Sequence, residues 1–133
     1  MWRALAAELG LELAIDTTDD VYALAVEDVL EQVLDNLLSN AFEATPEGGS
    51  VKIETVATED HVEVHVVDSG PGLNEVEREM ALRRFWRGRE NQSEGTGLGL
   101  AIVAQLVQLS SGSIELREAD GGGLDATIIL RRA

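Results

Sequence analysis

The sequence of 133 residues contains no cysteine, and this absence narrows its chemistry. Without thiols the chain has neither a disulfide framework nor a thiolate metal site, so a reducing compartment is permitted. Long apolar runs are also missing, because the most apolar stretch, residues 98–109, is well short of the roughly 20 residues that span a bilayer. We expect no membrane-spanning segment in this sequence. Since Glu8 and Glu12 interrupt its first residues, we expect no secretory signal either.

Basic residues are scarce as well. Ten Lys and Arg stand against 25 Asp and Glu, which gives a net charge of -15. Such a chain repels the phosphate backbone of nucleic acids, so DNA and RNA are not expected partners. Its hydrophobic content of 44% and charged content of 26% are ordinary for a globular protein, and its length suits a single domain over residues 1–133.

Hydrophobic periodicity predicts helices that alternate with strands. Helices are expected over residues 2–9, from 26 to just before Pro46, in a short stretch after 74, and over 97–109, the last of them buried. Strands are expected near residues 11–15, 21–25, 51–57, 62–66, 113–117 and 124–130, with a hairpin between 51–57 and 62–66. This order predicts an α+β fold with helices on one face of a mixed or antiparallel sheet. The polar span 74–94 is long for a connection and is typical of a functional lid.

Two asparagines, Asn36 and Asn40, lie four residues apart on a predicted helix and therefore share one of its faces, opposite the Val and Leu stripe. Asn is a mediocre helix former, so helix propensity does not explain the pair. A carboxamide oxygen is a hard, neutral ligand suited to a Mg²⁺ ion that is shared with substrate phosphates. The alternative is two solvated side chains on a wet face.

The segment Asp68-Ser-Gly-Pro-Gly72 directly follows a predicted strand. Such a segment is often only a turn. The functional interpretation is a carboxylate that accepts a hydrogen bond from an exocyclic amine, with glycines that let a flat ring approach the backbone. Both interpretations stay open on this motif alone.

A run of glycines, Gly95-Thr96-Gly97-Leu98-Gly99, opens the last predicted helix. Backbone N–H groups at a helix N-terminus bind anions, and glycines let a phosphate come close. The spacing differs from the Gly-x-Gly-x-x-Gly of dinucleotide-binding folds, which directly follows a strand, so dinucleotide binding is disfavoured. The alternative is a flexible entry to the helix.

Four of the ten basic residues gather inside the predicted lid beside Phe85 and Trp86; they are Arg83, Arg84, Arg87 and Arg89. Guanidinium groups recognise phosphate oxygens through paired N–H donors. A basic run is usually a solvated face, but the position of this one next to the glycines favours phosphate contact.

Two histidines, His61 and His65, lie four residues apart on a predicted strand. At about 3.3 Å per residue they are too far apart to hold one metal ion, whose ligands lie at about 2 Å. We expect both to be exposed strand histidines.

Taken together, four segments resemble the N, G1, F and G2 boxes of the histidine kinase catalytic ATP-binding domain. In chain order they are Asn36-Leu-Leu-Ser-Asn40-Ala, Asp68-Ser-Gly-Pro-Gly72, Arg84-Phe-Trp-Arg87 and Gly95-Thr-Gly-Leu-Gly99. Each box alone is weak, but four in this order and spacing are specific, and the likeness extends over almost the whole chain. The resemblance implies the Bergerat fold shared with gyrase, MutL and a heat-shock chaperone, a two-layer α/β sandwich whose mixed sheet packs against about three helices.

The resemblance implies roles by position, with ATP and Mg²⁺ as cofactors. Asn40 looks like the family's Mg²⁺ ligand, and Asn36 like its neighbour at the triphosphate. Asp68 matches the aspartate that accepts from the adenine amino group, in a pocket shaped by Gly70 and Gly72. The remaining implied positions are the phosphate-binding Gly95, Thr96, Gly97, Leu98 and Gly99, the lid over residues 74–94, and the F-box arginines Arg84 and Arg87, which act in catalysis.

One substitution bears on mechanism. In hydrolysing members of the superfamily, a glutamate that activates water lies four residues before the Mg²⁺-binding asparagine, and this chain has Asn36 there. An amide at this position suits transfer better than hydrolysis. The resemblance therefore implies a protein-histidine kinase that donates the γ-phosphate of Mg-ATP to a histidine.

The resemblance also implies partners. The acceptor histidine of this family lies on a separate helical dimerisation domain, so we expect this chain not to phosphorylate itself on His61 or His65. A response regulator is the implied downstream partner, and the isolated domain is expected to be a monomer. The implied location is cytoplasmic, in a full-length protein anchored in the bacterial inner membrane.

Two other functions compete with this one. Glu43, where the family often has a basic residue, and Ala44, where an aromatic residue is usual, favour a degenerate nucleotide-binding or protein-interaction module. The other candidate is a stand-alone ATPase or an anti-sigma-type serine kinase of the same fold, against which Asn36 argues because an amide does not activate water.

Overall fold

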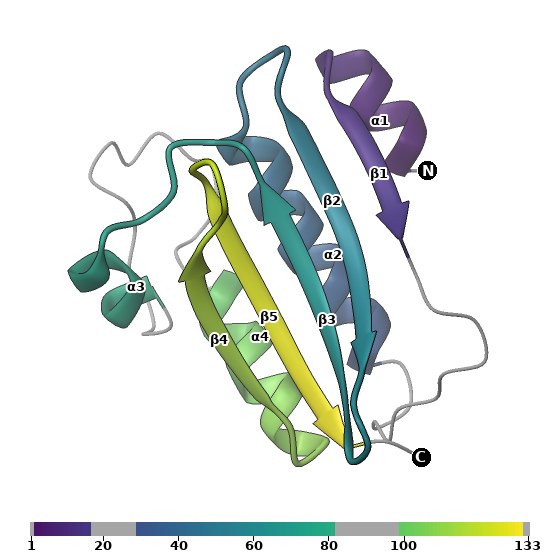
Figure 1. Cartoon of the computed structure of the whole chain (residues 1–133), viewed down its shortest axis with the longest axis vertical. Coiled ribbons are helices and arrows are strands. Elements are labelled where there is room, and N and C mark those ends of the chain that lie inside the picture. Colours follow the sequence, from purple (N-terminus) through teal and green to yellow (C-terminus); the bar gives the residue numbers. More distant parts are fainter. Residues whose placement is uncertain (1, 17–28, 82–98, 132–133) are drawn as a thin grey trace.

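The computed structural model describes residues 2–16, 29–81 and 99–131 of the chain (Figure 1). Its elements are, in chain order, α1 (Trp2–Leu9), β1 (Glu12–Asp16), α2 (Val29–Ala44), β2 (Ser50–Ala57), β3 (His61–Asp68), α3 (Glu75–Ala81), α4 (Gly99–Leu109), β4 (Ser113–Glu118) and β5 (Leu124–Arg131). The strand expected near residues 21–25 and most of the expected lid lie outside the described residues. No described helix is long and apolar enough to cross a membrane.

The strands form one mixed sheet of five, in the order β1-β2-β3-β5-β4. Strand β1 pairs parallel with β2, and every other neighbouring pair is antiparallel. The expected hairpin is confirmed by the pairing of β2 with β3, in which Ile53 lies opposite Val66. The parallel pair is explained by its connection, because a chain that leaves β1 and returns through α2 enters β2 in the same direction.

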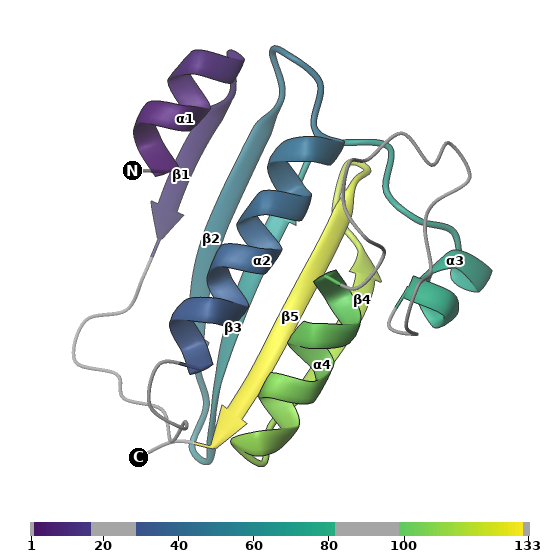
Figure 2. The same ribbon diagram turned by 180° about the vertical axis from the view of Figure 1, so that it is seen from behind.

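The core lies between this sheet and the helices on one of its faces (Figure 2). Alternate residues of β3 point toward the helices, and Val62, Val64 and Val66 are buried there. On the other side of the core, α2 buries the residues that follow a 3.6-residue period: Val29, Val33, Leu37, Leu38, Ala41 and Phe42. The result is the expected α+β two-layer sandwich, with a mixed sheet.

Three helices cover the sheet, and α3 lies off to one side (Figure 2). Helices α2 and α4 pack against each other, and α1 joins the layer through Trp2, whose ring meets Phe42 edge-on at a centroid distance of 5.4 Å. Helix α3 begins with a capping box, in which the Asn74 and Glu77 side chains each accept a hydrogen bond from the other residue's backbone N–H.

Helix α4 differs from the expectation that it is buried on all sides. Val103 and Val107 are buried against the sheet, but Ile102 is 39% exposed and Leu109 is 65% exposed. The reason is geometric, since the helix layer of a two-layer sandwich has an outer surface that no further layer covers.

The exchange Ile128→Ala tests the position of the core, because Ile128 on β5 is fully buried. We expect it to lower the free energy of unfolding by about 2–5 kcal/mol through lost burial and a cavity. The same truncation at the exposed Ile102 is the control and should cost less than about 1 kcal/mol. Urea denaturation measures both, and equal losses would contradict this core.

Candidate functional site

The carboxylate of Asp68 is the centre of the candidate site. Asp68 ends β3 and is only 6% exposed. Its Oδ1 atom accepts hydrogen bonds from the backbone N–H groups of Gly70, at 2.9 Å, and Leu124, at 3.2 Å. Its Oδ2 atom accepts no hydrogen bond from any residue that the structure describes. One oxygen is thus fixed by the backbone, and the other is available to an external donor.

Burial raises the pKa of the Asp68 carboxyl, and the N–H groups of Gly70 and Leu124 offset part of this rise. Desolvation has this effect because it penalises the charged form. A carboxylate in a largely buried residue, whose second oxygen has no partner among the described residues, gains strongly from a ligand that brings a hydrogen-bond donor. The arrangement favours the functional interpretation of the Asp68–Gly72 segment over that of a simple turn.

The glycines after Asp68 are required by close approach of the backbone. A Cβ atom on Gly70 would lie 2.5 Å from the carbonyl oxygen of Ala44, the last residue of α2. Gly72 has a φ of +71°, and its Cβ atom would lie 2.8 Å from the carbonyl oxygen of Gly123. The segment that follows β3 is therefore packed between the end of α2 and the turn between β4 and β5.

The turn between β4 and β5 is a part of the site that sequence reasoning missed. A Cβ atom on Gly123 would lie 1.9 Å from the carbonyl oxygen of Asp68, and the next residue, Leu124, donates to the Asp68 side chain. The available signal was the run of three glycines at residues 121–123, which the periodicity identified only as a turn between two strands. Its contact with Asp68 depends on the pairing of β3 with β5.

Asn36 and Asn40 lie on α2, and both are partly buried rather than fully solvated on a wet face. The Asn36 side chain donates from Nδ2 to the backbone oxygen of Gln32 at 3.0 Å. The Asn40 side chain forms no hydrogen bond with the described part of the chain. Since Ala44, one turn beyond Asn40, touches Gly70, the last turns of α2 lie beside the Asp68 segment. The amide oxygen of Asn40 has the chemistry of a hard-cation ligand.

Helix α4 begins at the same end of the sandwich. It lies beside α2 and runs in the opposite direction, so Gly99 at its N-terminus is on the side where α2 ends (Figure 2). The structure therefore brings Asp68, Gly70 and Gly72 to the same end as Asn40 and Gly99. The other predicted site residues lie outside the described residues: Arg84, Arg87, Gly95, Thr96, Gly97 and Leu98.

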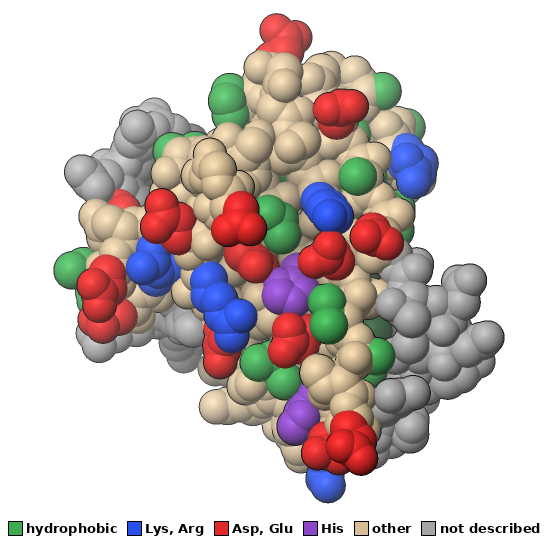
Figure 3. Space-filling view, in the orientation of Figure 1, with side chains coloured by type: hydrophobic (Ala, Val, Ile, Leu, Met, Phe, Trp, Pro, Cys, Tyr) green, Lys and Arg blue, Asp and Glu red, His purple; other side chains and the backbone are tan. Residues whose placement is uncertain are grey.

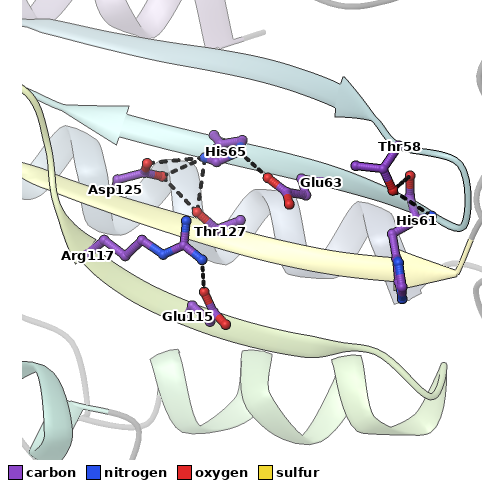
Figure 4. A network of polar contacts seen from close by, with 8 residues as sticks. All are labelled: Thr58, His61, Glu63, His65, Glu115, Arg117, Asp125 and Thr127. Atoms are coloured by element: carbon purple, nitrogen blue, oxygen red, sulfur yellow. Dashed lines mark hydrogen bonds and ion pairs between the residues drawn. The ribbon is translucent and has the colours of Figure 1, made fainter.

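The expectation for His65 is wrong. His61 is exposed, but the side chain of His65 is only 11% exposed and contacts Glu63, Asp125 and Thr127 (Figure 4). Strand alternation places it on the sheet face away from the helices, where the side chains of neighbouring strands cover it. The expectation assumed that a histidine on the polar face of the sheet is exposed to solvent. Among the described residues, no three His, Cys, Asp or Glu side chains are arranged to hold a metal ion.

Residues 25–133 match the family described as histidine kinase-, DNA gyrase B-, and HSP90-like ATPase. The chain belongs to this family. Over 127 residues, 95% of the chain, it is 35% identical to the sensor protein CreC of Escherichia coli K12. It is also 35% identical over 130 residues to the sensor protein kinase PmrB of Pseudomonas aeruginosa. The chain spans only 27% of the length of each of these relatives.

Solved structures of the family have the same fold. The catalytic domain of the histidine kinase ThkA matches with a TM-score of 0.88 and 27% identity, over 98% of this chain and 85% of that chain. Full-length ShkA in complex with AMPPNP matches with a TM-score of 0.81 and 32% identity, over 96% of this chain and 27% of that chain. The chain therefore shares its fold with these histidine kinase structures.

Two glycines of the β4–β5 turn offer a matched test of the site. Gly121 and Gly123 have φ values of +82° and +98°, so an alanine is strained at both, but only Gly123 lacks room for a Cβ atom. We expect Gly121→Ala to cost about 1 kcal/mol of unfolding free energy and Gly123→Ala clearly more. Urea denaturation measures the costs. NMR spectra should show shifted Gly70 and Leu124 amides in the Gly123 variant alone, and equal behaviour of the two variants would contradict the contact with Asp68.

Proposed function

We propose that this chain is the catalytic domain of a sensor histidine kinase, which binds Mg-ATP and donates its γ-phosphate to a histidine on another domain. The observation that carries the proposal is the Asp68 carboxylate, buried and fixed through one oxygen while the other is available to a donor. Membership of the ATPase family and the relatives' names as sensor kinases support it.

Asp68 is suited to the amino group of adenine. An exocyclic amine brings the N–H donor that Oδ2 lacks, whereas guanine presents a carbonyl oxygen at the same ring position and would be repelled. The backbone packing at Gly70 and Gly72 keeps side chains away from the carboxylate, so a flat ring can approach it. Asp68 thus acts as the residue that selects adenine.

Asn40 acts as the protein's ligand to Mg²⁺. Its amide oxygen is neutral and hard, and Mg²⁺ takes few protein ligands when phosphates supply the others. When bound, the ion neutralises charge that develops on the transferred phosphoryl group. The proposed phosphate-binding residues are Gly95, Thr96, Gly97, Leu98 and Gly99, of which Gly99 begins α4 and offers the N–H donor of a helix N-terminus. Arg84 and Arg87, in the proposed lid over residues 74–94, contribute positive charge.

Asn36 makes the site suited to transfer rather than to hydrolysis. An amide has no basic group with which to take a proton from water. The Asn36 side chain also donates from Nδ2 to the backbone oxygen of Gln32 in its own helix. A kinase needs a site that does not activate water, because ATP must remain intact until the acceptor arrives.

The proposed partners are a helical dimerisation domain that carries the acceptor histidine and a response regulator that receives the phosphate. The curated relatives are several times longer than this chain, which leaves room in them for such domains. Residues 1–133 then form one cytoplasmic catalytic domain of a kinase anchored in the bacterial inner membrane. Isolated, this domain is a monomer.

Asp68→Asn tests the adenine contact. Asn can accept the same two backbone N–H bonds at Oδ1, so the fold is retained, but its NH₂ group faces the amino group of adenine donor to donor. We expect AMPPNP to bind about 10- to 100-fold more weakly, from the loss of a hydrogen bond to a charged group. Asn40→Ala should remove the advantage of added Mg²⁺. Calorimetric titration measures each, with the exposed Asp35→Asn as control. Unchanged affinity of the Asp68 variant would contradict the adenine assignment.

Phosphoryl transfer is tested with labelled ATP and the helical dimerisation domain of the same full-length kinase. We expect acid-labile label on that domain and none on this chain, because His61 and His65 lie on the sheet face away from the helices, whereas Asn40 lies on α2, on the other face. Label on either histidine, or release of inorganic phosphate faster than transfer, would contradict the proposed reaction. The variants His61→Gln and His65→Gln identify the labelled position if any label appears.

A further inference from the structure

The sheet face away from the helices carries an unusual buried histidine. Acidic, basic and histidine side chains gather on this face (Figure 3). Near its middle, the Nε2 atom of His65 lies 3.0 Å from Oε1 of Glu63. Its Nδ1 atom lies 3.0 Å and 3.1 Å from the carboxylate oxygens of Asp125, and 3.0 Å from the hydroxyl oxygen of Thr127 (Figure 4). Both ring nitrogens therefore face carboxylates.

This geometry favours a proton on each nitrogen. Only the imidazolium form donates from both Nδ1 and Nε2, whereas a neutral ring would present a lone pair to Glu63 or to Asp125. The Thr127 hydroxyl donates to Oδ1 of Asp125 at 2.9 Å, so its oxygen remains available to accept from His65. The charged ring thereby ties β3 to two successive outward-facing residues of β5.

The charges on every neighbouring strand favour this form. Besides Glu63 and Asp125, the face holds Glu54 opposite His65 on β2, and Glu115 opposite Thr127 on β4. The cations are fewer, with Lys52 paired to Glu54 and Arg117 paired to Glu115. Burial lowers the pKa of His65, but hydrogen bonding and attraction to Asp125 and then to Glu63 outweigh it, so this pKa lies above its ordinary value of 6.5.

The histidine lies next to the contact that fixes the Asp68 carboxylate. Asp125 directly follows Leu124, whose N–H group donates to Oδ1 of Asp68. Across the strands, Asp125 is in register with Val67, the residue before Asp68. The link from His65 to Asp125 thus holds the start of β5 against β3 one residue away from the Leu124–Asp68 hydrogen bond.

We propose that His65 is a positioning residue for the nucleotide site, whose imidazolium holds the start of β5 so that Leu124 keeps Asp68 oriented toward adenine. This inference rests on the proposed function, in which Asp68 receives the adenine amino group. It adds a dependence of nucleotide affinity on a residue that touches neither nucleotide nor metal.

A pH dependence follows from this role. Because the folded-state pKa of His65 lies above 6.5, the stabilisation from its contacts is fully present below pH 6.5 and is lost as the pH rises through the folded-state value. Nucleotide affinity should fall over the same range. By reciprocity, bound nucleotide must raise the pKa of His65 by an amount that corresponds to the change in affinity.

The experiment is calorimetric titration with Mg-AMPPNP between pH 6 and pH 9 on the unmodified chain, His65→Gln and His61→Gln. His61 is the matched control, since it is exposed on the same strand and the same face. Ionisation of the nucleotide is common to all three proteins and cancels in ratios of dissociation constants. At pH 6 we expect the unmodified chain and His61→Gln to bind Mg-AMPPNP about five-fold more tightly than His65→Gln, a ratio at the lower end of usual coupling between two sites. At pH 9 we expect all three proteins to bind with equal affinity.

NMR titration of the His65 ring in the unmodified chain gives a readout that does not depend on a variant. We expect a pKa above 6.5 without nucleotide and a further rise with saturating Mg-AMPPNP. A pKa that nucleotide leaves unchanged, or the same affinity ratio at every pH, would overturn the positioning role while leaving the proposed function intact. No nucleotide binding by the unmodified chain at any pH would overturn the proposed function and this inference with it.

Discussion

The two backbone hydrogen bonds to Oδ1 of Asp68 are the constraint on which the candidate site depends. They come from segments far apart in the sequence, Gly70 just after β3 and Leu124 at the start of β5. Both can form only because the chain around them lacks side chains at Gly70, Gly72 and Gly123. A carboxylate is thereby held in a fixed orientation without a side-chain partner among the described residues, which leaves its second oxygen to define what the site accepts.

Much of the fold could be predicted from local patterns. The apolar stripe of α2 and the alternation in β2 and β3 each agree with the burial that the structure has, because one face of each element meets the same core. Helix α4 has apolar residues all round, so its period could not indicate which side meets the sheet, and Ile102 and Leu109 proved exposed. Its orientation is decided by packing between layers, which a single segment does not encode.

The candidate site could be predicted only in part, for a related reason. Asp68 was found because it directly follows a strand whose alternation is evident in the sequence, and Asn40 because it shares one face of a helix with Asn36. The role of Gly123 and the burial of His65 depend on which residues of β5 lie opposite β3, some 60 positions later. Cross-strand register of this kind follows from the whole sheet, so the glycine run at residues 121–123 indicated only a turn, and no local pattern indicated the burial of His65.

Strand β4 forms one edge of the sheet, and its composition has a consequence for association between copies. An edge strand exposes unpaired backbone groups that can template a strand of another molecule. Here that edge carries Glu115, Arg117 and Glu118 within six residues. Charges of this density disfavour strand addition, because a second strand would have to bring its own side chains against them. The β4 edge of the sheet is therefore protected against edge-to-edge association between copies.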